Sequence, residues 1–382
     1  MIRKVNAMKV RIERDEILKG LQKTQNIAEK RTTLPVLSYI LMEAYQNQIE
    51  LLATDLEISF KDSYSAEIIT EGSAVISAKT FFGIVKGLSE KSIYIEKKKN
   101  NQIYISDGRT EYTLFGLAPS EFPSFPSYED MYFISVESAV LKEMIEKTVY
   151  SIAGEELRYN LAGIYLERIS DPESKLRMVS TDGHRLSLID KDVSGLDHVE
   201  LQKGIIIPKK GVYEISRLLD KTGDVKLGIK ENTLVIKKDK MVLAVRLLSG
   251  EFPDYNSVIP KSNDKDIKVL RTSLMTALLR VALLTSERFK GVQFNISDKK
   301  IHIISENPDI GKAEEKVDIE YKGPDFQCAF NPRYFVEALE CMKSEYINLS
   351  LYDQSSPCII TGTGDEGFLS LIMPMKLKER EW

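Results

Sequence analysis

Val179-Ser180-Thr181-Asp182-Gly183-His184-Arg185 is one of three related stretches that recur at a nearly constant spacing. Leu52-Ala53-Thr54-Asp55-Leu56-Glu57 carries the same Thr-Asp pair 127 residues earlier, and Ile304-Ser305-Glu306-Asn307 takes the matching place 124 residues later. A second landmark agrees, because Glu121-Phe122-Pro123 returns as Glu251-Phe252-Pro253, 130 residues apart. One period shared by unrelated landmarks predicts an internal repeat of about 125 to 130 residues.

Three copies of this repeat account for nearly all 382 residues. We expect three similar domains at residues 1–130, 131–260 and 261–382, each close to the commonest domain size. We call these ranges the first, second and third copy. Tandem domains of one kind suit the construction of a ring or an arc better than that of a single active-site cleft.

Hydrophobic periodicity predicts an α+β fold in each copy. Runs such as 92–96, 102–105 and 234–237 alternate apolar and polar residues, which is typical of half-buried strands in antiparallel sheets. Two helices are expected in each copy, at 15–28, 79–90, 139–152, 209–221, 272–285 and 332–343. Each domain is therefore predicted to pack two helices on antiparallel sheets.

Composition narrows the class of protein. No uninterrupted apolar stretch approaches the ~18 to 20 residues that span a bilayer, and no signal-peptide pattern is present. Three cysteines, an odd number, lie at Cys328, Cys341 and Cys358, without the spacing of a disulfide framework. We therefore expect buried, reduced thiols and a cytoplasmic protein. Met8 is a more natural start than Met1, so residues 1–7 are expected to form an extension outside the fold.

A net charge of −4 argues against a protein that holds nucleic acid by bulk electrostatics. Basic residues nevertheless gather on the outward face of some predicted helices, whereas the third copy has acidic residues there. The basic positions are Lys19, Lys23, Lys79, Lys86, Lys210, Arg217 and Lys221, and the acidic ones are Glu337 and Glu340. Such a stripe is either a solvated helix face or a local surface for DNA.

The helix predicted at 272–285 has apolar residues on two sides. Leu274, Leu278 and Val281 form one stripe, while Leu279 and Leu283 lie opposite. An apolar second face is either buried within its own domain or covered by another subunit.

Signals for catalysis are weak. Asp182 and His184 could serve a hydrolase, but a third catalytic group is not apparent, and the three histidines lack metal-ligand spacing. The sequence at 362–367 matches the Gly-x-Gly-x-x-Gly pattern of dinucleotide-binding sites. That site needs a helix directly after the glycines to hold the pyrophosphate, and a strand is expected at 368–372 instead. We predict a hairpin turn there, and no enzyme activity, cofactor or metal.

Several segments resemble the bacterial DNA sliding clamp family, the beta subunit of DNA polymerase III. The similarity extends from Met8 to Leu377, in the right order and spacing. It rests on Thr32-Thr33-Leu34-Pro35-Val36-Leu37, Ala53-Thr54-Asp55-Leu56-Glu57, Thr181-Asp182-Gly183-His184-Arg185-Leu186, Ile207-Pro208-Lys209-Lys210-Gly211, Gly250-Glu251-Phe252-Pro253-Asp254-Tyr255 and Met373-Pro374-Met375-Lys376-Leu377.

The resemblance implies a head-to-tail homodimer that closes six domains into a ring around duplex DNA. Topological linkage would hold the ring on DNA without tight phosphate contacts, which suits an acidic chain. The replicative polymerase, the clamp loader and repair proteins would attach through short linear peptides. By similarity, the DNA-facing residues are Arg31, Arg158, Tyr159, Lys209 and Lys210.

The same resemblance implies a peptide-binding cleft between the second and third domains, where flexible methionines tolerate related peptides. Carried over position by position, it comprises Leu161, Thr181, Gly183, His184, Arg185, Leu186, Pro253, Val258, Ser356, Leu371, Ile372, Met373, Pro374 and Met375. Ser257 stands where many members have an Arg, which puts one polar contact in doubt. The tail 378–382 runs past the family's usual end, and Trp382 could either reach back to the cleft or stay free.

For the dimer contact, the resemblance implies Leu283 and Leu284 of one chain against Tyr112 and Leu114 of the other. Leu283 is also one of the two leucines on the second apolar face of its helix, which favours the interface explanation. The alternative function is a repeat-built peptide-binding scaffold that does not encircle DNA.

Overall fold

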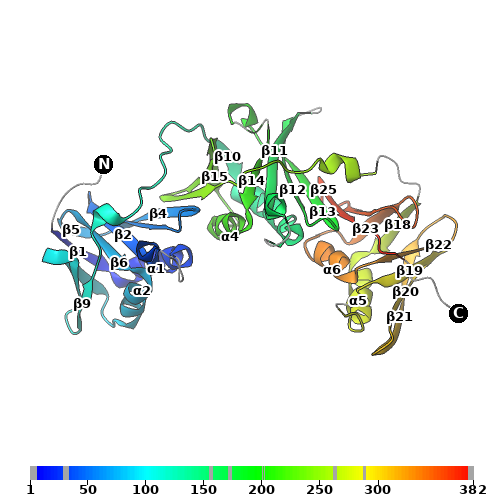
Figure 1. Cartoon of the computed structure of the whole chain (residues 1–382), viewed down its shortest axis with the longest axis horizontal. Coiled ribbons are helices and arrows are strands. Elements are labelled where there is room, and N and C mark those ends of the chain that lie inside the picture. The colour runs from blue at the N-terminus through cyan, green and yellow to red at the C-terminus, as the bar shows by residue number, and fades with distance from the viewer. Residues whose placement is uncertain are drawn as a thin grey trace. The chain divides into compact units, whose positions relative to one another are not determined.

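The three copies fold into the same order of elements (Figure 1). Each runs strand, helix, three strands, strand, helix and three strands, and the first copy has one extra strand, β5. The computed structural model describes residues 7–28, 34–154, 158–170, 174–199, 201, 203–260, 265–286 and 290–376. The expectations for residues 1–6 and for the tail at 378–382 lie outside these residues. Within them, Met8 is fully buried in the first strand.

The first copy contains β1 (Met8–Glu13), α1 (Arg14–Ile27), β2 (Tyr39–Tyr45), β3 (Gln48–Thr54), β4 (Ile58–Ser65), β5 (Glu67–Thr70), β6 (Gly72–Ser77), α2 (Ala78–Gly87), β7 (Ser92–Lys97), β8 (Gln102–Ser106) and β9 (Glu111–Phe115). The second contains β10 (Ile134–Glu137), α3 (Ser138–Glu146), β11 (Gly163–Ser170), β12 (Ser174–Thr181), β13 (Arg185–Asp192), β14 (Ile205–Pro208), α4 (Lys209–Leu218), β15 (Asp224–Lys230), β16 (Thr233–Lys238) and β17 (Met241–Arg246). The third contains β18 (Lys265–Leu270), α5 (Arg271–Ala282), β19 (Val292–Ser297), β20 (Lys300–Asn307), β21 (Gly311–Glu320), β22 (Phe326–Phe330), α6 (Pro332–Glu340), β23 (Tyr346–Leu351), β24 (Cys358–Gly362) and β25 (Phe368–Ile372).

All six predicted helices are present, and each ends earlier than the periodicity suggested. The largest difference is in α3, predicted to reach residue 152 and ending at Glu146. The chain leaves the helix where the Thr148 hydroxyl donates to the carbonyl of Met144 at 2.7 Å and Thr148 takes a non-helical φ of −124°. A short 3-10 turn then continues the apolar pattern at Val149–Ser151, which explains why periodicity alone misplaced the end.

Strand pairing joins the copies into continuous antiparallel sheets. The strand orders are β5-β1-β7-β8-β9, then β10-β15-β16-β17-β4-β3-β2-β6, then β14-β11-β12-β13-β25-β24-β23-β18-β21-β20-β19-β22. We call the pairing of β4 with β17 the first junction and that of β13 with β25 the second junction. In both, the last strand of one copy pairs with the strand that ends the three-strand run of the preceding copy.

Two compact units emerge from this pairing. One combines residues 1–135 with 224–247 and contains the first junction, and the other combines 136–223 with 248–382 and contains the second. The predicted boundaries at 130 and 260 stay predictions, because the units divide the second copy between them.

Burial agrees with the other sequence predictions. Cys328 and Cys358 are buried and Cys341 is half-buried, and none forms a disulfide. The glycine-containing segment 362–367 forms the turn between β24 and β25, as predicted. Among the described helices, none is long and apolar enough to cross a membrane.

Candidate functional site

The turn that carries the repeated Thr-Asp pair is fixed by its own side chains. The Thr181 hydroxyl donates to the carbonyl of Arg185 at 2.6 Å and accepts from the Gly183 amide at 3.1 Å. Asp182 Oδ1 accepts from the amides of His184 and Arg185 at 2.9 and 3.1 Å. Gly183 has a φ of +87°, a conformation that glycine adopts without steric cost. The turn therefore presents Gly183 and His184 to solvent at the start of β13.

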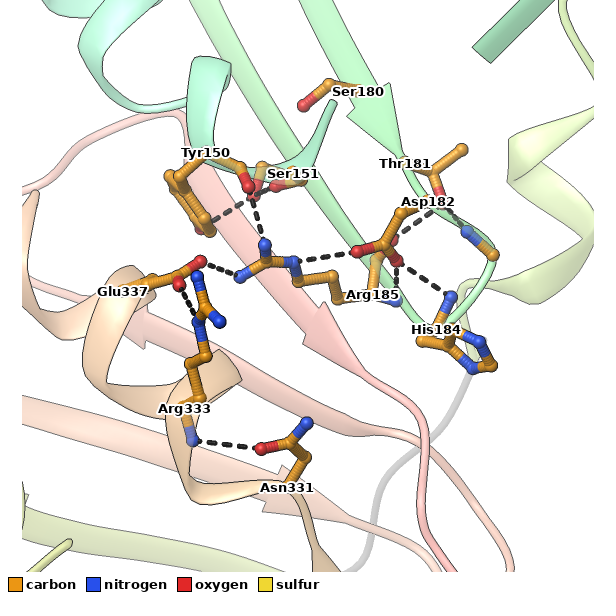
Figure 2. A network of polar contacts seen from close by, with 12 residues as sticks. Tyr150, Ser151, Ser180, Thr181, Asp182, His184, Arg185, Asn331, Arg333 and Glu337 are labelled. Atoms are coloured by element: carbon orange, nitrogen blue, oxygen red, sulfur yellow. Dashed lines mark hydrogen bonds and ion pairs between the residues drawn. The ribbon is translucent and has the colours of Figure 1, made fainter. Parts of the chain in front are cut away.

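Arg185 anchors this turn to its surroundings (Figure 2). Its guanidinium donates to Asp182 Oδ2 at 3.1 Å, to Glu337 Oε2 on α6 at 2.5 Å and to the carbonyl of Tyr150 at 2.6 Å. It also lies over the ring of Tyr334, 4.6 Å from the centroid. With these partners in place, Arg185 is a positioning residue that ties β13 to α6.

Glu337 differs from the sequence expectation of an outward acidic face. It accepts from Arg185 and, at 2.6 Å, from Arg333 Nε, so its charge is neutralised within the fold. Burial alone would raise the pKa of Glu337, but the bonds from Arg333 and Arg185 outweigh it and lower the pKa. Glu340 is exposed, so it alone of the two keeps the expected position.

The second junction continues beyond the paired strands. Leu186 pairs with Leu371 and Arg185 with Ile372. The Met373 amide then donates to the carbonyl of His184 at 2.9 Å, and the Met375 amide donates to the carbonyl of Ala329 at 2.7 Å. These backbone bonds hold both methionine side chains at a surface where each is 37% exposed.

An apolar cluster forms the floor beneath this surface. It consists of Val179, Leu186, Leu188, Tyr255 and Leu371. Of the predicted cleft residues, Leu161, Thr181, Arg185, Leu186, Leu371 and Ile372 are buried, Ser356 and Pro374 are half-buried, and Gly183, His184, Pro253, Val258, Met373 and Met375 are exposed. The predicted cleft residues thus divide into a buried set and an exposed set, and we call Val258, Met373 and Met375 of the exposed set the exposed rim. The Ser257 hydroxyl donates to the carbonyl of Asp254 at 2.7 Å.

Tyr255 connects the linker between the second and third copies to β11 and β12. Its hydroxyl donates to Glu167 and accepts from Arg177 Nη1 at 3.1 Å, and Arg177 also binds Asp190 at 2.6 Å. Burial is the main cause that raises the pKa of Tyr255 to about 12. The network stabilises the linker beside the exposed rim.

A buried ion pair lies deeper in the second junction. Lys147 on the second copy is 1% exposed at its side chain, and its Nζ lies 2.7 Å from Asp365 and 2.8 Å from Glu143. Asp365 also accepts from Ser344 Oγ at 2.6 Å and from two backbone amides. Burial would raise the pKa of Asp365, but Lys147 and Ser344 outweigh it and hold the pKa at about 2. Sequence reasoning missed this pair.

Comparisons with known proteins place the chain in a family. Residues 8–126, 135–254 and 256–376 match, in that order, the N-terminal, central and C-terminal domains of the DNA polymerase III beta subunit. The chain belongs to the DNA polymerase III beta subunit family. The α+β fold class and the succession of three clamp domains are confirmed, and the function is that of a DNA sliding clamp, a processivity factor of replication.

Relatives of this clamp cover almost its whole length. The beta sliding clamp of Vibrio cholerae is 31% identical over 97% of this chain and 100% of its own, and that of Escherichia coli K12 is 30% identical over the same shares. A crystal structure of the Caulobacter crescentus clamp, with polyethylene glycol bound at a putative beta-motif tethering region, matches with a TM-score of 0.92 at 30% identity, over 97% of this chain and 100% of that one. The Bartonella birtlesii clamp bound to griselimycin matches with a TM-score of 0.91 at 30% identity and the same coverage.

Four of the five predicted DNA-facing residues of the clamp lie in the described part. Arg158 and Lys210 are exposed, Tyr159 is 63% exposed and Lys209 is half-buried. The Lys209 amide donates to the carbonyl of Ala162 at 3.1 Å, which brings the start of α4 next to the turn that contains Tyr159. Arg31 lies outside the described residues.

The predicted dimer residues of the clamp lie at two separate edges. Tyr112 is 37% exposed and Leu114 is half-buried on β9, while Leu283 is 79% exposed and Leu284 half-buried just after α5. Leu279 is 47% exposed, so the second apolar face of α5 is not buried within its own unit. Phe115, which the sequence prediction did not include, is 78% exposed at the end of β9.

The hydrolase alternative finds no support in the geometry. Asp182 is occupied by the backbone of its turn and by Arg185, and the ring of His184 stacks on Tyr334 with centroids 6.5 Å apart. Among the residues that the structure describes, no group of three or more His, Cys, Asp or Glu could hold a metal ion.

Proposed function

We propose that two copies of this chain close head to tail into a ring around duplex DNA, and that the second junction receives short peptides of replication proteins. The observation that carries the ring is a pairing rule. The last strand of a copy, β17 or β25, pairs with the strand that ends the three-strand run of the preceding copy, β4 or β13.

Two strands do not have the partner from another copy that this rule gives to their equivalents. In the first copy the last strand is β9, which pairs only with β8 in the described chain. In the third copy the strand equivalent to β4 and β13 is β21, whose residues 311–318 pair only with β20 in the ranges described. An unpaired edge is a template for another strand. Two chains that pair β9 with β21 in both directions leave no free end, so the assembly closes.

Side chains at these edges suit a subunit contact. Tyr112 and Phe115 are exposed on β9, and Leu279 and Leu283 are exposed on and beside α5. A groove of about 660 Å³ lies between α5 and β21, lined by residues that include Thr276, Arg280 and 315–320. Apolar side chains beside a groove and a free strand edge are typical of a homodimer interface.

Retention on DNA would then come from closure of the ring. A net charge of −4 supplies little overall attraction for phosphate, so Arg158, Tyr159, Lys209 and Lys210 would only centre a sliding duplex. The exposed rim of Val258, Met373 and Met375 over an apolar floor supports a peptide-binding role. The clamp is proposed to work in the cytoplasm without catalysis of its own.

The test is retention on nicked circular DNA at high salt, after loading by a matching clamp loader with ATP. We expect the clamp to stay on the circle and to leave once the DNA is cut to a linear form. A Leu283→Asp variant, which places a charge in the proposed contact, is the matched control and should not be retained. Loss of the unchanged chain from circles and linear DNA alike, with loading confirmed, would favour the scaffold that does not encircle DNA.

A further inference from the structure

A pocket of about 230 Å³ lies at the first junction, entirely within one unit. Its walls come from the Thr-Asp turn of the first copy, the linker between the first and second copies, and the strands β16 and β17 with the turn before β16. The lining residues are Leu56, Glu57, Ser59, Pro126, Asn232, Thr233, Ala244 and Arg246.

The turn beside this pocket has the same hydrogen bonds as the turn at the second junction. The Thr54 hydroxyl donates to the carbonyl of Ile58 at 3.0 Å, and Asp55 Oδ1 accepts from the amides of Glu57 and Ile58 at 2.9 and 2.6 Å. The Arg246 amide donates to the carbonyl of Glu57 at 2.8 Å, just as the Met373 amide donates to the carbonyl of His184. The two junctions therefore share one backbone frame.

Strand register turns this likeness into a position-by-position correspondence. Val235 pairs with Ala244 at the first junction, and Ile359 pairs with Leu371 at the second. Counting from these pairs and from the shared Thr-Asp, the equivalent positions are Leu56 and Gly183, Glu57 and His184, Ser59 and Leu186, Asn232 and Ser356, Ala244 and Leu371, and Arg246 and Met373. Each second member belongs to the proposed peptide cleft, so the pocket occupies the cleft's place in the repeat.

The chemistry of the pocket differs from that of the cleft. Arg246 and Glu57 are both exposed, and neither forms an ion pair with any residue that the structure describes. Leu56 is 49% exposed beside them, which keeps an apolar contact available. An unpaired guanidinium in a pocket favours a carboxylate, because it can bind both oxygens at once. The neighbouring carboxylate of Glu57 would repel a ligand that carries several phosphates. It can accept a hydrogen bond from a backbone amide of a peptide.

We propose that this pocket is a second peptide-binding site, for a short acidic segment of a partner protein. A carboxylate of the segment binds Arg246, and an apolar side chain next to it contacts Leu56 and Pro126. The volume is below the roughly 300–1,000 Å³ of sites for drug-sized ligands, so only a few residues of the segment enter. The inference rests on the proposed function in taking the peptide cleft as its template.

The experiment is fluorescence anisotropy with a rhodamine-labelled peptide, Gly-Asp-Leu-Asp-Leu-Gly, on the full chain. The matched peptide has Asn in place of both Asp residues. We expect the acidic peptide to bind at least about tenfold more tightly, because only a carboxylate forms a charged hydrogen-bonded contact with Arg246. Arg246→Met, which installs the residue of the equivalent position, should abolish that preference. The double change Met373→Ala and Met375→Ala should leave it intact.

Three outcomes would overturn the proposal. Equal binding of the two peptides would show that a carboxylate is not recognised. If the acidic peptide no longer bound the methionine double variant but still bound Arg246→Met, the peptide would be located at the second junction. Displacement of the acidic peptide by a short DNA duplex, with Arg246→Met abolishing the binding of both, would make the pocket a phosphate site. Retention on circular DNA is measured separately on the unchanged chain, so failure of the ring and failure of the pocket give different results.

Discussion

The two junctions use one backbone arrangement and cover it differently. At the first junction, Tyr128 from the linker lies over the sheet, with Lys61 Nζ 5.1 Å and Lys237 Nζ 4.2 Å from its ring centroid. At the second junction the equivalent linker position, 130 residues later, is Val258, which is 45% exposed. An aromatic ring thus covers part of the first junction beside the pocket, whereas a smaller, exposed residue takes this place at the second junction.

The two junctions also differ in how deeply their charged groups are buried. The cation–π contacts of the first junction lie near the surface, where each contributes about 0.5 to 1 kcal/mol. Beneath the second junction lie the fully buried pair of Lys147 and Asp365 and the bridge from Arg185 to Glu337. The exposed rim of the second junction thus lies near a fully buried ion pair, whereas Lys23, which pairs with Asp62 at the first junction, is partly exposed.

The largest effect is expected from Asp365→Asn. The change keeps the shape of the side chain but leaves buried Lys147 with Glu143 as its charged partner, and breaking a buried ion pair costs on the order of 3 kcal/mol. Hydrogen exchange of the β25 amides should report a loss of that size, while exchange in β17 stays unchanged. The exposed neighbour Glu366 supplies the control, because Glu366→Gln should alter stability by less than about 0.5 kcal/mol. Equal effects on β17 and β25 would contradict the difference between the junctions.

Acid should weaken the second junction by a smaller amount. The folded pKa of Asp365 is about 2, below the ordinary value of 3.8. Its contribution is therefore complete above pH ~4 and is lost as the pH falls toward 2, which amounts to about 2 kcal/mol. Glu337 and Glu143 have lowered pKa values and act in the same direction. The opening free energy of β25, measured by hydrogen exchange, should fall over this pH range in the unchanged chain and stay constant in Asp365→Asn. The lysine–ring contacts of the first junction do not titrate in this range.

The smallest effect is expected from exchanging residues between the two turns. Leu56 has a φ of +74° where Gly183 has +87°, and a left-handed conformation costs a residue with a side chain roughly 1 kcal/mol. A Cβ at Gly183 would meet no atom within 4 Å, so Gly183→Leu should destabilise by about this conformational cost alone. Leu56→Gly should stabilise by about 1 kcal/mol or less. Thermal denaturation of both variants checks the opposite signs, and changes of the same sign would show that the turns are not equivalent.

Local patterns in the sequence were enough to predict the repeat and its elements. The Thr-Asp pairs at 54–55 and 181–182 do form the same turn, because their side chains bond to backbone groups within four residues. Helix positions followed from apolar spacing, and Leu279 and Leu283 are exposed as an interface would require. Helix ends were less predictable because side-chain bonds such as that of Thr148 decide them.

Contacts between distant residues were not predictable from one sequence. Lys147 and Asp365 are 218 positions apart, and Arg185 and Glu337 are 152 apart, so no local spacing marks them as partners. Glu337 was consequently assigned to an outward face. The DNA-facing, cleft and dimer residues came from resemblance, and they stay predictions because their partners are other molecules.

The junctions also bear on how such a gene can diverge. Strand pairing uses main-chain groups, which every residue except proline supplies, so the joint between copies survives almost any exchange of side chains on its surface. A duplicated segment could then lose its methionines, gain an arginine, or exchange a glycine for a leucine without coming apart from its neighbour. The first and second junctions differ in all three ways, and each is still spanned by a continuous antiparallel sheet of its own.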